Sequence, residues 1–378
     1  MQPQGDQSKQ PTEVNNQPGR VDPGSVNDPI QTKTPIASWH ILLVLVVLLI
    51  TGLVTSTKIN TLLLSNRTKS AMHTNTNQHQ TTNKHPVTSK PATLSASTNV
   101  WKSRINPAAI PLGDGKVAST PKVNYVDSCT QNFSAAATGK APWINQTNDT
   151  WNSLNKPAVQ GAIAWTQARY NVNVSGNNRI ITSNDLPSGQ TTGIFPITHN
   201  DPVYQYDANP NHIATQTIDY TLPLNPTAAT IPGCLGLGPI GILNDGVVLF
   251  NALDASGRDA VAHEVQDACN GHPDGSNEYH YHEIPACILN QAKGSSTLVG
   301  YALDGYGIYV ERDANGNLPT NADLDQCHGR TSPVMWNGKL TNIYHYDATL
   351  EYPYTIGCFH GTPIQAARAT NQKPPLRP

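Results

Sequence analysis

The stretch that decides the fold occurs twice, first as Leu243-Asn244-Asp245-Gly246-Val247-Val248-Leu249-Phe250 and again as Leu303-Asp304-Gly305-Tyr306-Gly307-Ile308-Tyr309. In each copy an Asp-Gly step separates two short apolar runs. Residues that tolerate positive φ at such a step suit the tight turns that match strand twist. The sequence therefore predicts β-hairpins over residues 240–250 and 298–310.

The repetition continues downstream of both hairpins. Cys269-Asn270-Gly271-His272 corresponds to Cys327-His328-Gly329-Arg330, and Tyr279-His280-Tyr281-His282 corresponds to Tyr344-His345-Tyr346-Asp347. Each copy then ends with a cysteine, Cys287 or Cys358. Landmarks repeated in the same order indicate an internal duplication over about residues 239–361. Two units are too few for a solenoid, so we expect them to pair face to face.

The rest of the C-terminal part has the same sequence pattern, in which short apolar runs are interrupted by Gly, Pro, Asn and Asp. Another hairpin is predicted over residues 171–182, with its turn at Ser175-Gly176-Asn177-Asn178. Short helices are predicted at 259–268 and at 158–169. The expected fold is all-β or β-rich α+β, and the closest architecture is a sandwich-like domain.

The N-terminal third has a different composition, too polar to bury a core except for one apolar segment. Residues 36–54 contain no Asp, Glu, Lys or Arg, and at roughly 1.5 Å per residue they are long enough to cross a hydrocarbon layer of about 30 Å. We predict one transmembrane helix at 36–54, a disordered tail at 1–35 and a disordered, basic, Thr/Asn/Ser-rich linker at 55–120. The β domain then covers residues 121–363, and 364–378 form a C-terminal tail.

The apolar segment has a second interpretation as a cleaved signal peptide. Its polar lead of residues 1–35 carries both signs of charge and no Ala-x-Ala site follows, so a retained anchor is favoured. The flanking basic residues, Arg20 and Lys33 before it against Lys58, Arg67 and Lys69 after it, favour a cytoplasmic C-terminal side. Large domains translocate largely regardless of such charges. We therefore base the membrane orientation on the cysteines, whose pairing is typical of oxidising compartments. The domain is placed outside the cytoplasm, attached to the cell membrane by a single pass.

All six cysteines lie in the C-terminal part, an even number that favours pairing over catalysis in a non-cytosolic setting. Equivalent units should close equivalent loops, which pairs Cys269 with Cys287 and Cys327 with Cys358. Cys129 is then left for Cys234. The competing scheme crosses the units, for example through a bond between Cys269 and Cys327.

At these residues the chain resembles the YHYH family, named for the tetrapeptide that stands here as Tyr279 to His282. The resemblance covers roughly residues 173–361 and includes the runs 257–264, 300–309 and 352–358. It implies an exported or surface domain, and because the family's activity is not established, it implies architecture and location rather than chemistry. Members usually read Cys-Asn-Gly-His and Tyr-His-Tyr-His in the second unit as well, where this chain has Arg330 and Asp347.

The histidines of the first unit are candidate metal ligands. If Tyr279 to His282 is a strand, its period of two places His280 and His282 on one face, from which their imidazoles can converge on one ion. Zn or Cu(II) needs further ligands, for which His272 is the nearest candidate, followed by His263 and Glu264. In the alternative interpretation the histidines bond to buried carbonyls, the tyrosines fill the core, and the motif only locks the fold. In the second unit an Arg–Asp pair replaces a His–His contact without a metal, which fits this alternative.

These features leave two classes of function open. The first is a membrane-anchored, extracytoplasmic binding or structural module that holds one divalent metal, Zn or Cu. The second is a metal-dependent hydrolase or oxidase acting on an extracellular or wall glycan. The linker between Thr55 and Gly113 has seven Lys or Arg and no acid, which suits contact with an anionic lipid surface or wall polymer. From Asp114 onward the chain holds 14 basic and 22 acidic residues, so nothing indicates nucleic-acid binding.

Overall fold

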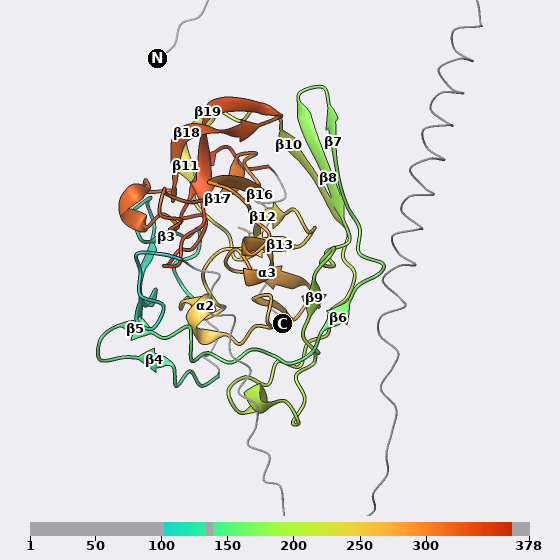
Figure 1. Ribbon diagram of the computed structural model, residues 1–378, viewed down its shortest axis with the longest axis vertical. Helices are drawn as coiled ribbons and strands as arrows, with labels where there is room; N and C mark the ends of the chain where they lie inside the picture. Colours follow the sequence, from blue (N-terminus) through green and yellow to red (C-terminus); the bar gives the residue numbers. More distant parts are fainter. Residues whose placement is uncertain (1–101, 134–138, 365–378) are drawn as a thin grey trace, which may run out of the picture. The chain divides into compact units, whose positions relative to one another are not determined.

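The computed structural model describes residues 102–133 and 139–364 (Figure 1). The predicted tail at 1–35, the membrane segment at 36–54, most of the linker and nearly all of the C-terminal tail lie outside these residues. Within the described ranges, no helix is long and apolar enough to cross a membrane.

One eight-stranded mixed sheet forms the centre of the described domain, in the order β14-β15-β13-β12-β16-β17-β19-β18. Its strands run through the middle of Figure 1, from β18 and β19 to β13. They comprise β12 (Pro239–Leu243), β13 (Val248–Phe250), β14 (Gly271–Pro273), β15 (Tyr279–Tyr281), β16 (Ser296–Ala302), β17 (Gly307–Glu311), β18 (Gly329–Trp336) and β19 (Lys339–Asp347). Every residue of β13 and β17 is buried, as expected for strands covered on both faces.

The sheet consists of two equivalent halves, which confirms the internal duplication at the level of topology. In each half the Asp-Gly hairpin lies inside, and the hairpin that carries the Tyr-His-Tyr strand lies outside. That strand runs parallel to the second strand of the Asp-Gly hairpin, as β15 does to β13 and β19 does to β17. The turn glycines Gly246 and Gly305 have φ of 91° and 95°, the conformation that the sequence required there.

The halves meet edge to edge, so the expected face-to-face pairing is wrong. β12 and β16 are antiparallel neighbours, with Ile242 opposite Tyr301. The first strand of each unit has only one partner within its own unit. Its other edge would leave backbone N–H and C=O groups unpaired, and joining the two edges satisfies both rows. The duplicated units therefore form one continuous layer and not the two layers of a sandwich.

The remaining strands lie outside this sheet. The predicted hairpin of β7 (Tyr170–Ser175) and β8 (Asn178–Ser183) is present, and β8 also pairs with β10 (Ile218–Pro223). The others are β1 (Ile110–Pro111), β2 (Val117–Ala118), β3 (Val126–Asp127), β4 (Ile144–Asn145), β5 (Thr150–Trp151), β6 (Ile163–Ala164), β9 (Thr191–Thr192), β11 (Ala228–Gly233) and β20 (Phe359–Gly361). The described helices are α2 (Ala260–His263), α3 (Ala286–Leu289) and the 3-10 turns Pro202–Gln205 and Asn321–Asp323.

Two helix predictions and one boundary need correction. The region predicted as a helix at 158–169 is extended, because Gly161 has φ of 122° and β6 pairs with β9. The helix predicted at 259–268 is limited to α2, capped by Asp259. The ordered domain also begins before residue 121, since Ile110 in β1 is fully buried in the core.

The three disulfides join Cys129 to Cys234, Cys269 to Cys287 and Cys327 to Cys358. This is the pairing within units that the duplication predicted, and not the pairing across units. Two of the bonds close the Tyr-His-Tyr hairpin of their own copy. The third ties the segment after β3 to the loop before β12.

Candidate metal centre

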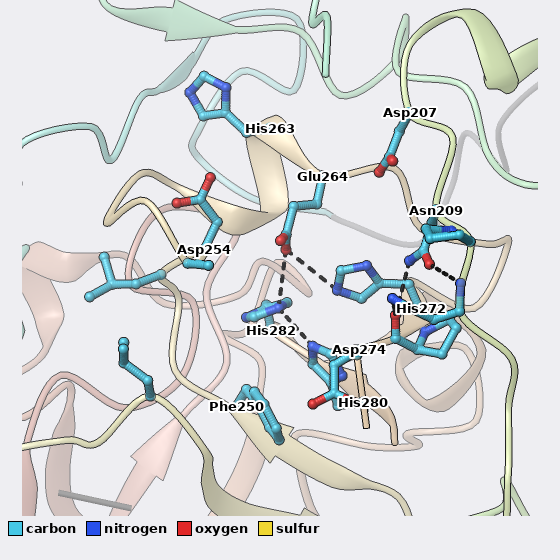
Figure 2. Close-up of a pocket in the computed structure, with 17 residues that line it drawn as sticks. Asp207, Asn209, Phe250, Asp254, His263, Glu264, His272, Asp274, His280 and His282 are labelled. Atoms are coloured by element: carbon cyan, nitrogen blue, oxygen red, sulfur yellow. Dashed lines mark hydrogen bonds and ion pairs between the residues drawn. The ribbon is translucent and has the colours of Figure 1, made fainter. Parts of the chain in front are cut away.

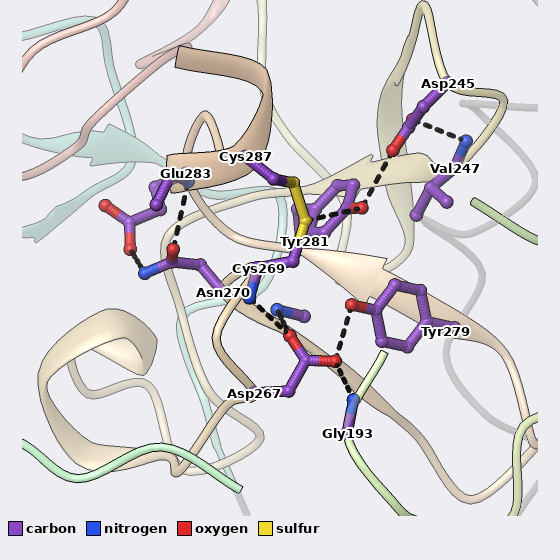
Figure 3. Close-up of a disulfide and its surroundings, with 12 residues drawn as sticks. Gly193, Asp245, Val247, Asp267, Cys269, Asn270, Tyr279, Tyr281, Glu283 and Cys287 are labelled. Carbon is purple, nitrogen blue, oxygen red and sulfur yellow. Dashed lines mark hydrogen bonds between the residues drawn. A yellow bond between two sulfur atoms is a disulfide. The ribbon is translucent and has the colours of Figure 1, made fainter. Parts of the chain in front are cut away.

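The tyrosines of the first Tyr-His-Tyr strand fix its position in the core (Figure 3). The Tyr279 hydroxyl donates to Asp267 at 2.9 Å, and the Tyr281 hydroxyl donates to Asp245 at 2.8 Å. Asp245 is the aspartate of the repeated Asp-Gly turn, where it also accepts the backbone N–H of Val247. Burial raises the pKa of both aspartates to about 6. Each tyrosine thus ties the strand to a different neighbouring loop.

The second strand repeats both contacts, which shows that this role of the tyrosines is common to the two copies. Tyr344 donates to Asp325 at 3.0 Å, and Tyr346 donates to Asp304 at 2.5 Å. The tyrosines therefore hold the strand in place, as the alternative interpretation expected. The tyrosine contacts do not account for the histidines that alternate with them along the strand.

The glycine of each Cys-x-Gly step is required by the tyrosine that crosses it. A Cβ at Gly271 would lie 2.2 Å from the Tyr279 ring, and one at Gly329 would lie 2.5 Å from the Tyr344 hydroxyl. Real Cβ atoms do not approach other atoms so closely. The Cys-x-Gly and Tyr-His-Tyr elements therefore form one structural unit. It places the residue after the glycine, His272 in the first copy, directly opposite His280.

The three histidines His272, His280 and His282 meet in one buried cluster (Figure 2). Each offers a ring nitrogen, and these atoms all lie within 4.8 Å of one another. The Nδ1 atoms of His280 and His282 contact the carbonyl oxygens of Glu278 at 3.1 Å and Asn251 at 2.5 Å. A carbonyl only accepts, so these contacts place the proton of a neutral imidazole on Nδ1 and leave Nε2 as a lone pair. The Nε2 atoms of the two rings lie 3.1 Å apart.

This arrangement calls for a cation between the rings. Two lone pairs that face each other at hydrogen-bond distance repel unless a proton or a metal ion lies between them. Histidine ligands of metals generally donate their second ring N–H to a carbonyl or carboxylate, which sets the tautomer and the ring orientation. His272 adds a further donor, because neither of its ring nitrogens makes a hydrogen bond within the described part of the chain. An unsatisfied buried polar group of this kind costs about 1–3 kcal/mol.

Electrostatics keeps two of the three rings in the form that binds metals. Burial lowers the pKa of His280 to about 3, and burial together with the neighbouring His280 and His282 holds the pKa of His272 well below its ordinary value. Burial also acts to lower the pKa of His282, but Glu264, the Asn251 carbonyl and Asp254 together outweigh this effect and raise that pKa. Near neutral pH, His272 and His280 are therefore neutral, as metal ligation requires.

Glu264 brings a carboxylate to the edge of the cluster. Its Oε2 lies 3.4 Å from Nε2 of His272 and 3.3 Å from Nε2 of His282. Ligands held at about 2.0–2.1 Å in a tetrahedral zinc site are separated from one another by about 3.3 Å. Glu264 therefore lies at ligand-like distances from two of the histidines, although it is not part of the group of three nitrogens that all lie within 4.8 Å of one another. At this position its carboxylate can also contact a water molecule bound to an ion held by the histidines.

His263, the other candidate from the same helix, lies outside the cluster. Its Nε2 contacts the carboxylate of Asp114 at 2.9 Å (Figure 2 shows its ring turned away from Glu264). The helix ends at His263, and Glu264 is already extended, so the two side chains leave the chain in different directions. The structure thus brings together four of the five predicted ligands and separates the fifth.

The cluster opens into a pocket of about 360 Å³, which gives it a free side. Phe250 stacks on the His280 ring at a centroid distance of 4.1 Å and closes one wall. Asp207, Asp254 and Asp274 line the pocket together with the amides of Asn209 and Asn211. The pocket lining, unlike the ligands, was not predicted from the sequence.

The tyrosine anchors Asp267 and Asp325 were also missed as site residues. Both stand two positions before the first cysteine of their copy, so the repeated pattern is Asp-x-Cys-x-Gly rather than Cys-x-Gly. Comparison of the two copies over this longer stretch would have identified them.

The fold and the site define a class of protein. It is a β-rich, disulfide-bonded domain with two copies of a tyrosine-anchored histidine strand, and the first copy carries a cluster of three histidines of metal-ligand type. The family model described as YHYH protein matches residues 219–320, which include the whole first copy and its histidine cluster. The chain is a YHYH domain-containing protein. Searches of curated proteins and of solved structures gave no match.

Proposed function

We propose that this domain binds one divalent transition metal ion, Zn or Cu(II), through His272, His280 and His282. One observation carries the proposal: the Nε2 atoms of His280 and His282 face each other at 3.1 Å while both Nδ1 atoms contact backbone carbonyls. Imidazole donors suit Zn and Cu among the common divalent ions. Three histidines and an open side leave one position of a tetrahedral ion free for water or for a ligand from the pocket.

Metal content of the full-length chain tests this proposal. After chelation, reloading with Zn or Cu(II) and dialysis, the wild type should retain about one ion per chain. The variant with His280→Ala and His282→Ala should lose nearly all of it, because one remaining histidine cannot hold the ion. His199→Ala removes an exposed histidine and should leave the metal content unchanged. A wild type that retains no ion, or a double variant that retains as much as wild type, would refute the site.

A catalytic use of the same site is the second candidate, and Glu264 is the observation that favours it. Its carboxylate lies beside the three histidines and lines the pocket. There it is placed to take a proton from a water molecule and to return that proton to a leaving group, as in metal-assisted hydrolysis. The pocket carries acids and amides, so a neutral polyhydroxylated substrate such as a wall glycan fits it better than an anion.

Glu264→Gln separates binding from hydrolysis. Glutamine keeps the shape of the side chain but cannot accept the proton. In a screen of wall and extracellular polymers, the variant should retain the metal and lose cleavage by about 100-fold or more. If wild type cleaves a polymer and Glu264→Gln cleaves it equally well, Glu264 is not the proton acceptor. If the metal-loaded wild type cleaves none of the polymers, the function is binding alone.

We further propose that the domain lies outside the cytoplasm, attached through residues 36–54. The support is that all six cysteines are paired, which is typical of oxidising compartments. Protease treatment of intact cells should remove the domain, and protection of the domain until lysis would contradict this location.

A further inference from the structure

The second copy contains a counterpart of the metal cluster in which two of the three histidines are replaced. In the β14–β15 pair His272 lies opposite His280, and in the β18–β19 pair Arg330 lies opposite His345. Arg330 therefore stands where the first copy has His272. By the same register, Asp347 stands where the first copy has His282.

The surroundings of His345 also repeat those of His280. Its Nδ1 contacts the carbonyl oxygen of Ile343 at 3.0 Å, as that of His280 contacts Glu278. Tyr309 contacts its ring edge-on from the position equivalent to that of Phe250, which stacks on His280. His345 is fully buried, and its Nε2 has no hydrogen-bond partner in the described ranges.

The donors around this Nε2 again have the spacing of metal ligands. Glu311 Oε2 lies 3.5 Å away and Asp347 Oδ1 lies 3.6 Å away. One imidazole and two carboxylates are a donor set that suits Zn, Mn or Fe(II). Asp347 is completely buried, and neither of its oxygens makes a hydrogen bond within the part of the chain that the structure describes.

The Arg330 guanidinium supplies the cation that this donor set requires. Its Nη2 lies 2.6 Å from Glu311, and its Nε lies 2.9 Å from Asp347. A guanidinium stays charged at any pH at which the protein is folded. Both carboxylates thereby share one positive charge that cannot dissociate from the chain.

We propose that the second copy is a latent metal site, closed by Arg330 as a built-in cation that takes the place of a divalent ion. Wild-type protein then holds metal in the first copy only. When the guanidinium is replaced by a neutral donor, two buried carboxylates and His345 remain without a cation, and the site takes up a divalent ion from solution.

The test places the substitutions in a chain whose first site is disabled by His280→Ala and His282→Ala, so that every bound ion belongs to the second copy. In this background Arg330→His restores the histidine of the first copy. After loading with Zn and dialysis, the metal content should rise from near zero to about one ion per chain. Arg330→Asn, which introduces a smaller neutral donor, should take up Zn as well, with lower affinity.

Two controls separate the site from non-specific binding. Arg330→Lys keeps a positive charge and should bind no Zn, and Arg330→His combined with His345→Ala should lose the gained ion. Circular dichroism and the melting temperature show which variants are folded. The proposal is overturned if folded Arg330→His and Arg330→Asn chains both remain at background metal content. Because the first site is absent from all these chains, the outcome does not depend on whether wild type binds metal.

Discussion

At the scale of single residues, the tyrosines and the histidines of the Tyr-His-Tyr motif have different contacts because they alternate along one strand. Tyr279 and Tyr281 donate to buried aspartates, whereas His280 lines the pocket and directs its Nε2 toward that of His282. The period of two along a strand makes this division possible, because neighbouring side chains point to opposite faces. The structural interpretation of the motif is therefore confirmed for the tyrosines, and the proposed metal binding concerns the histidines alone.

The aspartates that accept from these tyrosines should make the stability of the domain depend on pH. Burial raises the pKa of Asp245 from 3.8 to about 6. A carboxyl with a higher pKa in the folded state stabilises the fold most below the unfolded pKa, and this contribution is lost as the pH rises through about 6. The wild type should therefore lose stability between pH 4 and 7 relative to Asp245→Asn.

Urea unfolding of both chains at a series of pH values measures this difference. The free energy of unfolding of wild type, relative to Asp245→Asn, should fall by up to about 3 kcal/mol between about pH 4 and pH 7. Asp219→Asn, which removes an exposed carboxylate of β10, is the control and should follow the wild type. A wild type and an Asp245→Asn chain with parallel pH curves would show that Asp245 does not titrate in this range.

At the scale of elements, the sequence predicts hairpins well and helices poorly, for a physical reason. The hairpins depend on local turn chemistry, and glycines such as Gly246 and Gly305 adopt the positive φ that their turns need. The helix predicted at 158–169 depended on weak apolar spacing, and Val159 instead forms a bridge with Asp267. Long-range pairing of this kind outweighs local preference and leaves no signal within the segment itself.

The candidate ligands were predictable to a similar extent. His280 and His282 follow from strand periodicity, and His272 follows from its place just before that strand. The sequence could not show which of His263 and Glu264 joins the cluster. The helix α2 ends at His263, so the His263 side chain contacts Asp114 while the Glu264 side chain contacts the histidines. The pocket residues Asp207 and Asn209 come from a distant loop, so local sequence carries no signal that links them to the histidines.

At the scale of the whole domain, duplication followed by divergence explains why two equivalent halves would have unequal chemistry. The halves share the sheet topology, the disulfide, the glycine and both tyrosine anchors. They differ in the groups that face the ring of the central histidine. The first half presents three imidazoles toward a pocket, and the second presents carboxylates already paired with Arg330. In this account the second half stabilises the sheet, and the first half binds the metal.

X-ray absorption spectroscopy of the Zn- or Cu(II)-loaded full-length chain tests the central claim most directly, because it reports the atoms bound to the ion itself. We expect a first shell dominated by three imidazole nitrogens at about 2.0–2.1 Å for Zn, with one light atom completing it. His272→Ala should remove one imidazole from that shell. A shell of oxygen atoms without imidazole, or a chain that retains no ion after loading, would contradict the account.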